Sequence, residues 1–281
     1  MAESNSNWHG RRVLVAGCTG FLGSAVVEEL LAEGAEVVGL VRDRTSAATL
    51  AKHQLAGRVH IVHGCVEDLF RVHSALAVYE VNSVFHLIPA APFGPDRGIA
   101  TVLEAVRRYD PRVPTVVARP AISGSAVNAP VPLGVARFGE LFGRDPKSQR
   151  FVASTTIGLL EGTRTATHSD RGERDFVHVR DAARACLLLG EALGNRPIPH
   201  VHEAQFRTGW VHGNREMLAA LREGCAGRSP RAWFATPPAN PLGWSPSLNF
   251  SDAITDMVEW YREFVRSRGL GTRAAQPAQA A

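Results

Sequence analysis

The segment Val13–Gly23 constrains the fold of this chain more than any other part of its sequence. It reads VLVAGCTGFLG, an apolar run that breaks into glycines at every third position, Gly17, Gly20 and Gly23. A helical pattern of apolar residues follows over Phe21–Glu33. A buried strand, a glycine turn and an amphipathic helix in this order are typical of the first unit of a parallel α/β sheet.

The same glycines predict a site for a dinucleotide. In such a turn Gly17 allows the tight bend, Gly20 lets the backbone approach a pyrophosphate, and Gly23 lets the helix pack on the strand. The first turn of the helix adds N–H groups that lack intrahelical partners and attract an anion. We expect NAD or NADP to contact six residues of this segment: Gly17, Thr19, Gly20, Phe21, Leu22 and Gly23.

The end of the second apolar run leaves the choice between the two coenzymes open. This run ends in the letters LVRDR at residues 40–44. Asp43 can accept hydrogen bonds from the ribose hydroxyls of NAD, whereas Arg42 can pair with the extra phosphate of NADP. The alternative for both residues is that they are ordinary charged side chains of a solvated loop.

Composition places the chain among ordinary globular proteins. Of its 281 residues, 45% are hydrophobic and 21% are charged, and no segment approaches the roughly 20 apolar residues of a membrane span. The first residues, MAESNSNWHGRR, contain no apolar core of a signal peptide. We therefore expect a cytoplasmic protein that does not enter a membrane.

Neither the charge nor the metal-binding residue types indicate a further ligand class. The net charge is +4, but the basic residues are spread among acids and form no stripe with interleaved aromatics, so we expect no nucleic-acid partner. Four cysteines lack any CxxC pair, and the histidines lack the HxxxH spacing of a metal site. We expect no metal.

The first half of the chain alternates short apolar runs with helical patterns, which favours parallel βαβ units. Strands are predicted at Val13–Gly17, Glu36–Val41, Val59–Val62, Ser83–Leu87 and Thr115–Ala118. Helices are predicted at Phe21–Glu33, Asp68–Tyr79 and Arg97–Tyr109, with a weaker one at Ser46–Gln54. Right-handed crossovers then give a doubly wound Rossmann sheet with helices on both faces and the ligand at the carboxyl ends of the strands.

The stretch Pro120–Pro132 is unpatterned and is interpreted as a loop or a junction. A strand is predicted at Val135–Phe138, and helices at Gln149–Glu161, Val179–Leu193 and Ser251–Arg266. We expect a dinucleotide-binding domain over residues 8–145, to which parts of 170–205 return. A small C-terminal substrate lobe would occupy 146–268, and a disordered tail 269–281.

Four motifs in one order give the chain a family resemblance. They are the glycine turn, VFHL at Val84–Leu87, RDFVHVRDAARA at Arg174–Ala185, and the LGWSP…VEWYREF pattern at Leu242–Phe264. With them the chain resembles the extended short-chain dehydrogenase/reductase family. Within it, the chain is most similar to the NAD-dependent nucleotide-sugar epimerases and dehydratases, CDP-glucose 4,6-dehydratases among them. The resemblance runs from about Trp8 to Arg266.

The resemblance implies hydride-transfer chemistry on a nucleotide diphosphate sugar, as in an epimerase or in a dehydratase, which is a lyase. It implies that Leu87 lies beside the cofactor and that Arg137 and Glu140 meet the substrate. Arg174 matches an arginine that commonly binds the diphosphate, a role that suits a guanidinium fork. The alternative is a surface ion pair with Asp175 or Asp181. A homodimer or pairing with an active paralogue are the expected assemblies.

One departure from the family concerns the catalytic pair itself. The family's base is the tyrosine of a YxxxK pair on one helix face, and no tyrosine of this chain is followed four positions later by lysine. In one register the segment that carries the pair is absent, and VARFGELFGRD at Val135–Asp145 is the strand that follows it. In the other register Leu133 replaces the tyrosine and Arg137 the lysine.

Two functions therefore remain open. The chain is an enzyme with an unidentified base, or a silent dinucleotide-binding or nucleotide-sugar-binding protein. His86 is a candidate acid or base because imidazole titrates near neutrality, although a packed histidine explains it as well. Ser123 and Ser125 are candidates for a substrate-bonding role, although hydroxyls that satisfy their own loop explain them too. Whether the chain turns over a substrate stays open.

Overall fold

The structure is a computed structural model that describes residues 7–42, 55, 57–89, 97–121, 129–145, 150–163, 172–194, 201–230 and 238–274. The chain divides into two compact units. The first comprises Met1–Gly139, Val179–Arg207 and Ala239–Ser245, and the second Glu140–His178, Thr208–Pro238 and Pro246–Ala281. In this part of the chain, the first unit ends at Gly139 and the second begins at Glu140. The domain boundary at residue 145 that the sequence suggests stays a prediction.

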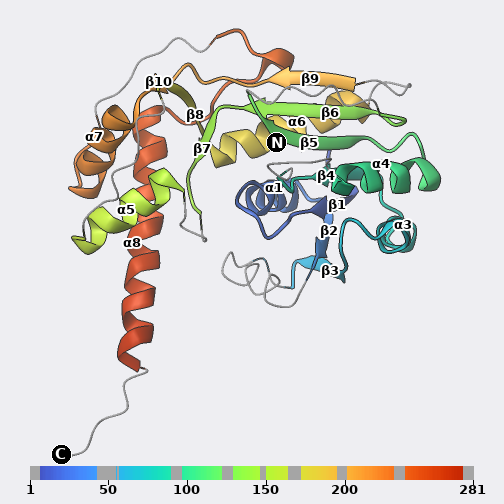
Figure 1. The fold of residues 1–281 in the computed structure, drawn as a ribbon, viewed down its shortest axis with the longest axis horizontal. Helices are drawn as coiled ribbons and strands as arrows, with labels where there is room; N and C mark the ends of the chain where they lie inside the picture. Colours follow the sequence, from blue (N-terminus) through green and yellow to red (C-terminus); the bar gives the residue numbers. More distant parts are fainter. Residues whose placement is uncertain are drawn as a thin grey trace, which may run out of the picture. The chain divides into compact units, whose positions relative to one another are not determined.

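A parallel sheet forms the centre of the first unit (Figure 1). Its strands follow the order β3-β2-β1-β4-β5-β6-β9, and every neighbouring pair is parallel. They are β1 (Arg12–Ala16), β2 (Glu36–Val41), β3 (Val59–His63), β4 (Ser83–His86), β5 (Thr115–Pro120), β6 (Leu133–Phe138) and β9 (Val201–Gln205). The predicted doubly wound α/β fold is confirmed.

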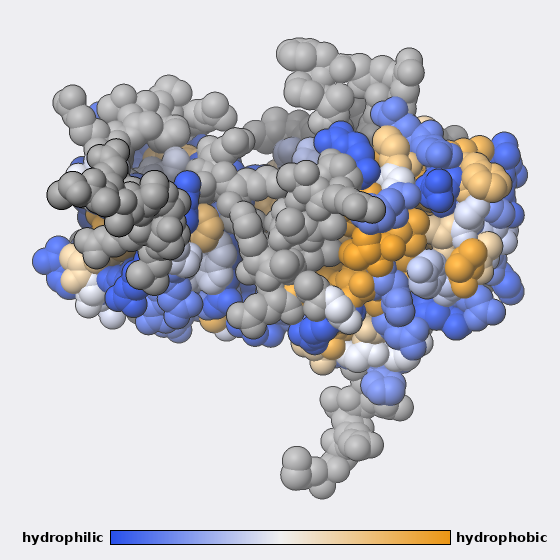
Figure 2. Space-filling view, turned by 90° about the horizontal axis from the view of Figure 1, so that it is seen from below, coloured by the Kyte–Doolittle hydropathy of each residue, from blue (hydrophilic) through white to orange (hydrophobic). Residues whose placement is uncertain are grey.

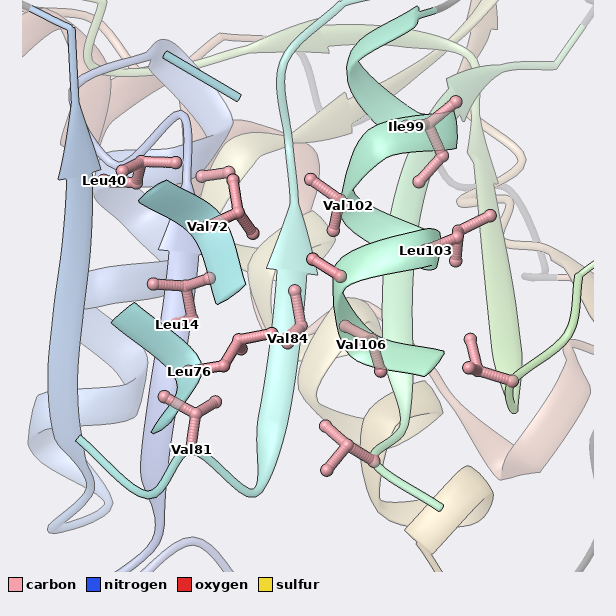
Figure 3. Packing of buried hydrophobic residues seen from close by; sticks show 14 of the residues in the cluster. Leu14, Leu40, Val72, Leu76, Val81, Val84, Ile99, Val102, Leu103 and Val106 are labelled. Atoms are coloured by element: carbon pink, nitrogen blue, oxygen red, sulfur yellow. The ribbon is translucent and has the colours of Figure 1, made fainter. Parts of the chain in front are cut away.

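Helices cover both faces of this sheet. Helices α3 (Leu69–Val78) and α4 (Arg97–Tyr109) pack together on one face, and α1 (Phe21–Ala32) and α6 (Val179–Gly194) pack together on the other (Figure 3). Figure 3 shows apolar side chains of α3 and α4 pointing at the strands. The core there includes Leu14, Leu40, Val72, Leu76, Val81, Val84, Ile99, Val102, Leu103 and Val106.

The strand and helix predictions for the first unit succeed where the apolar pattern is long. The bounds of β2 and α4 are as predicted, and the other predicted strands and helices that the structure describes agree to within about two residues. The predicted helix Ser46–Gln54 lies outside the described residues. Strand β9 was not predicted, because only Ala204 of its five residues is buried and the segment therefore lacks an apolar run.

The second unit packs three helices with a small sheet in the order β10-β8-β7. Its elements are β7 (Glu140–Phe142), α5 (Phe151–Glu161), β8 (Arg174–His178), β10 (Val211–His212), α7 (Asn214–Cys225) and α8 (Phe250–Ala274). The core gathers Phe142, Phe176, Met217, Leu221, Phe250, Ile254 and Met257, all at most 1% exposed. Helix α8 runs on into the segment that was expected to be disordered, and residues 275–281 lie outside the described ranges.

The surface carries apolar residues among hydrophilic ones (Figure 2). Phe70 and Val78 of α3 are the most exposed large apolar side chains of the described residues, at 78% and 74%. Single exposed apolar residues are normal for globular proteins. No helix among the described residues combines the length and the apolar content that a membrane crossing requires.

Candidate functional site

The glycine turn lies where the strand order of the sheet reverses. Strands β2 and β3 lie on one side of β1, and β4, β5, β6 and β9 lie on the other. Sheets of this kind bind ligands outside the carboxyl ends of the strands at such a reversal, because the two neighbouring loops diverge there. Residues 17–20 follow β1 and residues 87–89 follow β4, so both loops lie at this edge.

The backbone of the turn requires glycine at Gly17 and Gly23. Gly17 has φ +91°, and a Cβ atom on it would lie 3.1 Å from the carbonyl carbon of Leu87. A Cβ atom on Gly23 would lie 1.9 Å from the carbonyl oxygen of Gly17. The N–H of Gly20 donates to that same oxygen at 2.8 Å. The predicted tight bend at Gly17 and close packing at Gly23 are confirmed.

The start of α1 is suited to hold a pyrophosphate. Its cap residue is Gly20, so no side chain closes the end of the helix, and its first turn carries no acidic residue. The N–H groups of Leu22 and Gly23 point out of the helix start, where the dipole of the helix favours negative charge. A glycine at the cap also lets an anion approach the backbone.

Cys18 lies beneath the turn and supports it. The thiol is buried against β2, where its Sγ lies 4.0 Å from the carbonyl oxygen of Leu40. Gly39 makes room for it, since a Cβ atom there would lie 2.8 Å from Sγ. Burial raises the pKa of Cys18 to about 12, so the thiol stays protonated and acts as a packing group.

The residues that would decide between NAD and NADP follow β2. Arg42 is exposed at that strand end, and Asp43 lies outside the described residues. On the neighbouring strand end, the N–H of Gly64 donates to the carbonyl oxygen of Val41 at 3.0 Å. The preference for one coenzyme stays a prediction.

The candidate catalytic residues fall into two groups. His86 ends β4 between Ala16 and Val117 and is 1% exposed, as expected of a packed histidine. Ser123 and Ser125 lie outside the described residues. Their roles stay predictions.

The register that replaces the catalytic pair by Leu133 and Arg137 is wrong. Both residues belong to strand β6, which pairs with β5 in parallel, whereas the family's pair lies on a helix. The other register, in which the segment that carries the pair is absent, stays a prediction; residues 121–132 connect β5 to β6. A parallel crossover needs about a dozen residues, so this connection is near the minimum.

Arg137 makes contacts within the first unit. Its Nε donates to Oε2 of Glu203 at 2.9 Å, and its Nη1 donates to the carbonyl oxygen of Pro120 at 3.4 Å. Glu203 lies on the neighbouring strand β9. The guanidinium group is thus held at the carboxyl ends of β5 and β6.

Glu140 and Arg174 come together in the second unit. Nη1 of Arg174 lies 3.9 Å from Oε2 of Glu140, its Nη2 donates to Oδ1 of Asn214, and its guanidinium carbon lies 5.4 Å from the ring centre of Phe176. The neighbouring Asp175 accepts hydrogen bonds from Thr208 and Gly209. Sequence reasoning missed Asn214, because it begins α7, a helix that was not predicted.

The residues around Arg174 do not resemble a metal site. Within the described ranges, no group of three or more His, Cys, Asp or Glu side chains is arranged to hold a metal ion. Hydrogen-bond donors and a single guanidinium suit an anionic or hydroxyl-bearing ligand better than a cation.

Both the sequence and the fold of this chain are similar to those of known proteins. Residues 13–110 match the model of the NAD dependent epimerase/dehydratase family. A dTDP-glucose 4,6-dehydratase of Actinoplanes sp. is 28% identical over 143 residues, which are 46% of this chain and 43% of the dehydratase. Cinnamoyl-CoA reductase 1 of Oryza sativa is 32% identical over 96 residues, 34% of this chain and 28% of the reductase. The matches thus span less than half the length of these curated relatives.

Solved structures share the fold over most of the chain. A UDP-glucose 4-epimerase of Thermotoga maritima, solved with UDP-glucose, superposes with a TM-score of 0.70 at 18% identity, covering 90% of this chain and 99% of the epimerase. A dTDP-glucose 4,6-dehydratase of Bacillus anthracis, solved with NAD, gives 0.71 at 16% identity, covering 90% and 97%. Residues 13–110 thus match the model of the NAD dependent epimerase/dehydratase family, and the chain as a whole has the fold of these solved structures.

Proposed function

We propose that the chain binds NAD or NADP at the glycine turn and acts on a nucleotide diphosphate sugar by hydride transfer. The observation that carries this proposal is the start of α1, which is capped by Gly20, has no side-chain cap and carries no acidic residue in its first turn. Gly23 is needed for this turn, because a Cβ atom there would lie 1.9 Å from the carbonyl oxygen of Gly17. NAD is the coenzyme in the dehydratase structure of Bacillus anthracis. UDP-glucose is bound in the epimerase of Thermotoga maritima.

The residues of the site would divide the work of binding. The backbone of Thr19, Gly20, Phe21 and Leu22 would hold the pyrophosphate, while Arg42 or Asp43 would meet the adenosine ribose. Leu87, which is 9% exposed, would exclude water beside the coenzyme. The bound coenzyme supplies the hydride acceptor. Arg137, Glu140 and Arg174 would bind and orient the sugar nucleotide.

The second candidate function is a binding protein without turnover. In its favour, the segment that would replace the catalytic pair is strand β6, and Tyr261 is buried with its hydroxyl bound to the backbone. If the chain is an enzyme, His86 is the candidate base, and Ser123 and Ser125 are the candidates for bonding the substrate.

Location and assembly are proposed as well. All four cysteines are free thiols, which agrees with a reducing cytoplasm. A homodimer, or a pair with an active paralogue, is the proposed assembly.

The test compares two substitutions of glycine by alanine in helices of the first unit. Gly23→Ala places a Cβ atom against backbone, whereas Gly194→Ala places one 3.5 Å from the side chain of Arg11, which is an ordinary contact. Calorimetric titration with NAD and NADP should show binding to the unchanged protein and to Gly194→Ala. Gly23→Ala should lose binding at least about a hundredfold, because the misplaced turn loses its phosphate contacts.

Turnover is measured on the same preparations with UDP-glucose, dTDP-glucose and CDP-glucose. A 4-keto-6-deoxy sugar or the epimeric nucleotide sugar among the products supports the enzyme, and coenzyme binding without product supports the silent binding protein. Absence of binding by either coenzyme to the unchanged, folded protein rules out both the enzyme and the dinucleotide-binding protein.

A further inference from the structure

A carboxylate lies beside the guanidinium that would receive the diphosphate. Glu140 begins β7, Arg174 begins β8, and the parallel pairing of these strands places Glu140 opposite Phe176. The side chains of Arg174 and Glu140 are 18% and 31% exposed. The pair is thus only partly screened by water, and its attraction is stronger than that of a fully exposed ion pair.

Arg174 is oriented without being saturated. Its Nη2 donates to Asn214, while the 3.9 Å from Nη1 to Glu140 exceeds hydrogen-bond length. Its Nε is buried and has no hydrogen-bond partner among the described residues. Nη1 therefore keeps donors that a phosphate could use, and the carboxylate of Glu140 lies 3.9 Å from it.

The surroundings add negative rather than positive charge. His212 lies opposite Arg174 in the pairing of β10 with β8. Burial lowers the pKa of His212, although the carboxylates of Glu216 and Glu173 act in the opposite direction. The imidazole is therefore largely neutral at pH 7. Glu140 thus lies beside Arg174, and Glu173 and Glu216 add negative charge around His212, the residue opposite Arg174.

We propose that Glu140 determines specificity by competing with a diphosphate for Arg174. An incoming diphosphate must approach a carboxylate and displace it from the guanidinium, and this repulsion weakens binding. The inference rests on the proposed function, because it takes Arg174 as the diphosphate contact. On this proposal Glu140 lowers the affinity of the protein for nucleoside diphosphates. The affinity for a nucleoside without phosphates does not depend on Glu140.

The test measures the binding of UDP and of uridine to Glu140→Gln by calorimetry. Glutamine keeps the size of the side chain and removes its charge, so UDP should bind about tenfold tighter than to the unchanged protein. Binding of uridine should stay the same. Adding Arg174→Gln to Glu140→Gln should abolish the gain. Glu140→Asn serves as a second neutral variant if circular dichroism shows that Glu140→Gln does not fold.

Glu259→Gln is the matched control, since it removes one negative charge from an exposed position on α8. It should leave the affinity for UDP unchanged. Equal affinity of the unchanged protein and the folded neutral variant for UDP, or no binding by either, overturns the inference. NAD is titrated into the same samples as a test of the coenzyme site. If that site fails, NAD does not bind, and the comparison of UDP affinities still tests the role of Glu140.

Discussion

The hydroxyl of Tyr261 binds backbone in the second unit. It accepts a hydrogen bond from the N–H of Asp145 at 3.1 Å, and it lies 3.2 Å from the carbonyl oxygen of the same residue. Burial is the main cause that raises the pKa of Tyr261 above its usual value. The phenol therefore stays protonated at neutral pH and holds the turn after β7, which makes it unsuited to act as a base.

Tyr261→Phe should lower the free energy of unfolding by about 1–3 kcal/mol, because it leaves a buried backbone N–H without its acceptor. The raised pKa also gives a pH dependence: the contribution of Tyr261 is complete below the unfolded pKa of about 10 and is lost as the pH rises above it. Urea unfolding at neutral pH and above about pH 10 measures both effects. An equal alkaline loss in Tyr261→Phe would contradict the assignment.

Helix α3 shows how one side chain can fix the start of an element. Oδ1 of Asp68 accepts a hydrogen bond from the N–H of Arg71 at 3.0 Å, so Asp68 caps the helix. Asp68→Ala should cost about 1 kcal/mol in urea unfolding, because this N–H loses its partner. Asp68→Asn keeps an acceptor and should stay near the unchanged protein. Equal losses in both variants would assign the effect to charge rather than to the cap.

Elements with a long apolar pattern could be predicted from sequence, and elements completed by tertiary contacts could not. Strand β2 has four apolar residues among six and helix α4 has seven among thirteen at helical spacing, and the bounds of both are as predicted. Strand β10 has only two residues, and β9 buries a single side chain. Such segments become strands because a neighbouring strand supplies hydrogen bonds, which local periodicity does not record.

At the scale of the whole molecule, each unit has a core of its own, so stability should respond to changes in each separately. Leu76→Ala empties part of the first core and Met257→Ala part of the second, each at a cost of about 2–5 kcal/mol. In scanning calorimetry each variant should lower the midpoint temperature of a different unfolding transition. NAD at about 100 times its Kd should raise the free energy of unfolding of the first unit by about 2.7 kcal/mol. It should therefore shift only the transition that Leu76→Ala shifts. A single transition that both variants lower alike would show that the units unfold together.

The sequence by itself determined the parallel α/β class, the glycine turn and the place of that turn after the first strand. Local spacing suffices there, because Gly17, Gly20 and Gly23 meet within one turn of backbone. Only the tertiary structure decided that Leu133 and Arg137 lie on a strand, and that Glu140 and Asn214 meet Arg174. Those residues are up to 74 positions apart along the chain, and pairing of strands and packing of helices bring them together, which no local pattern encodes.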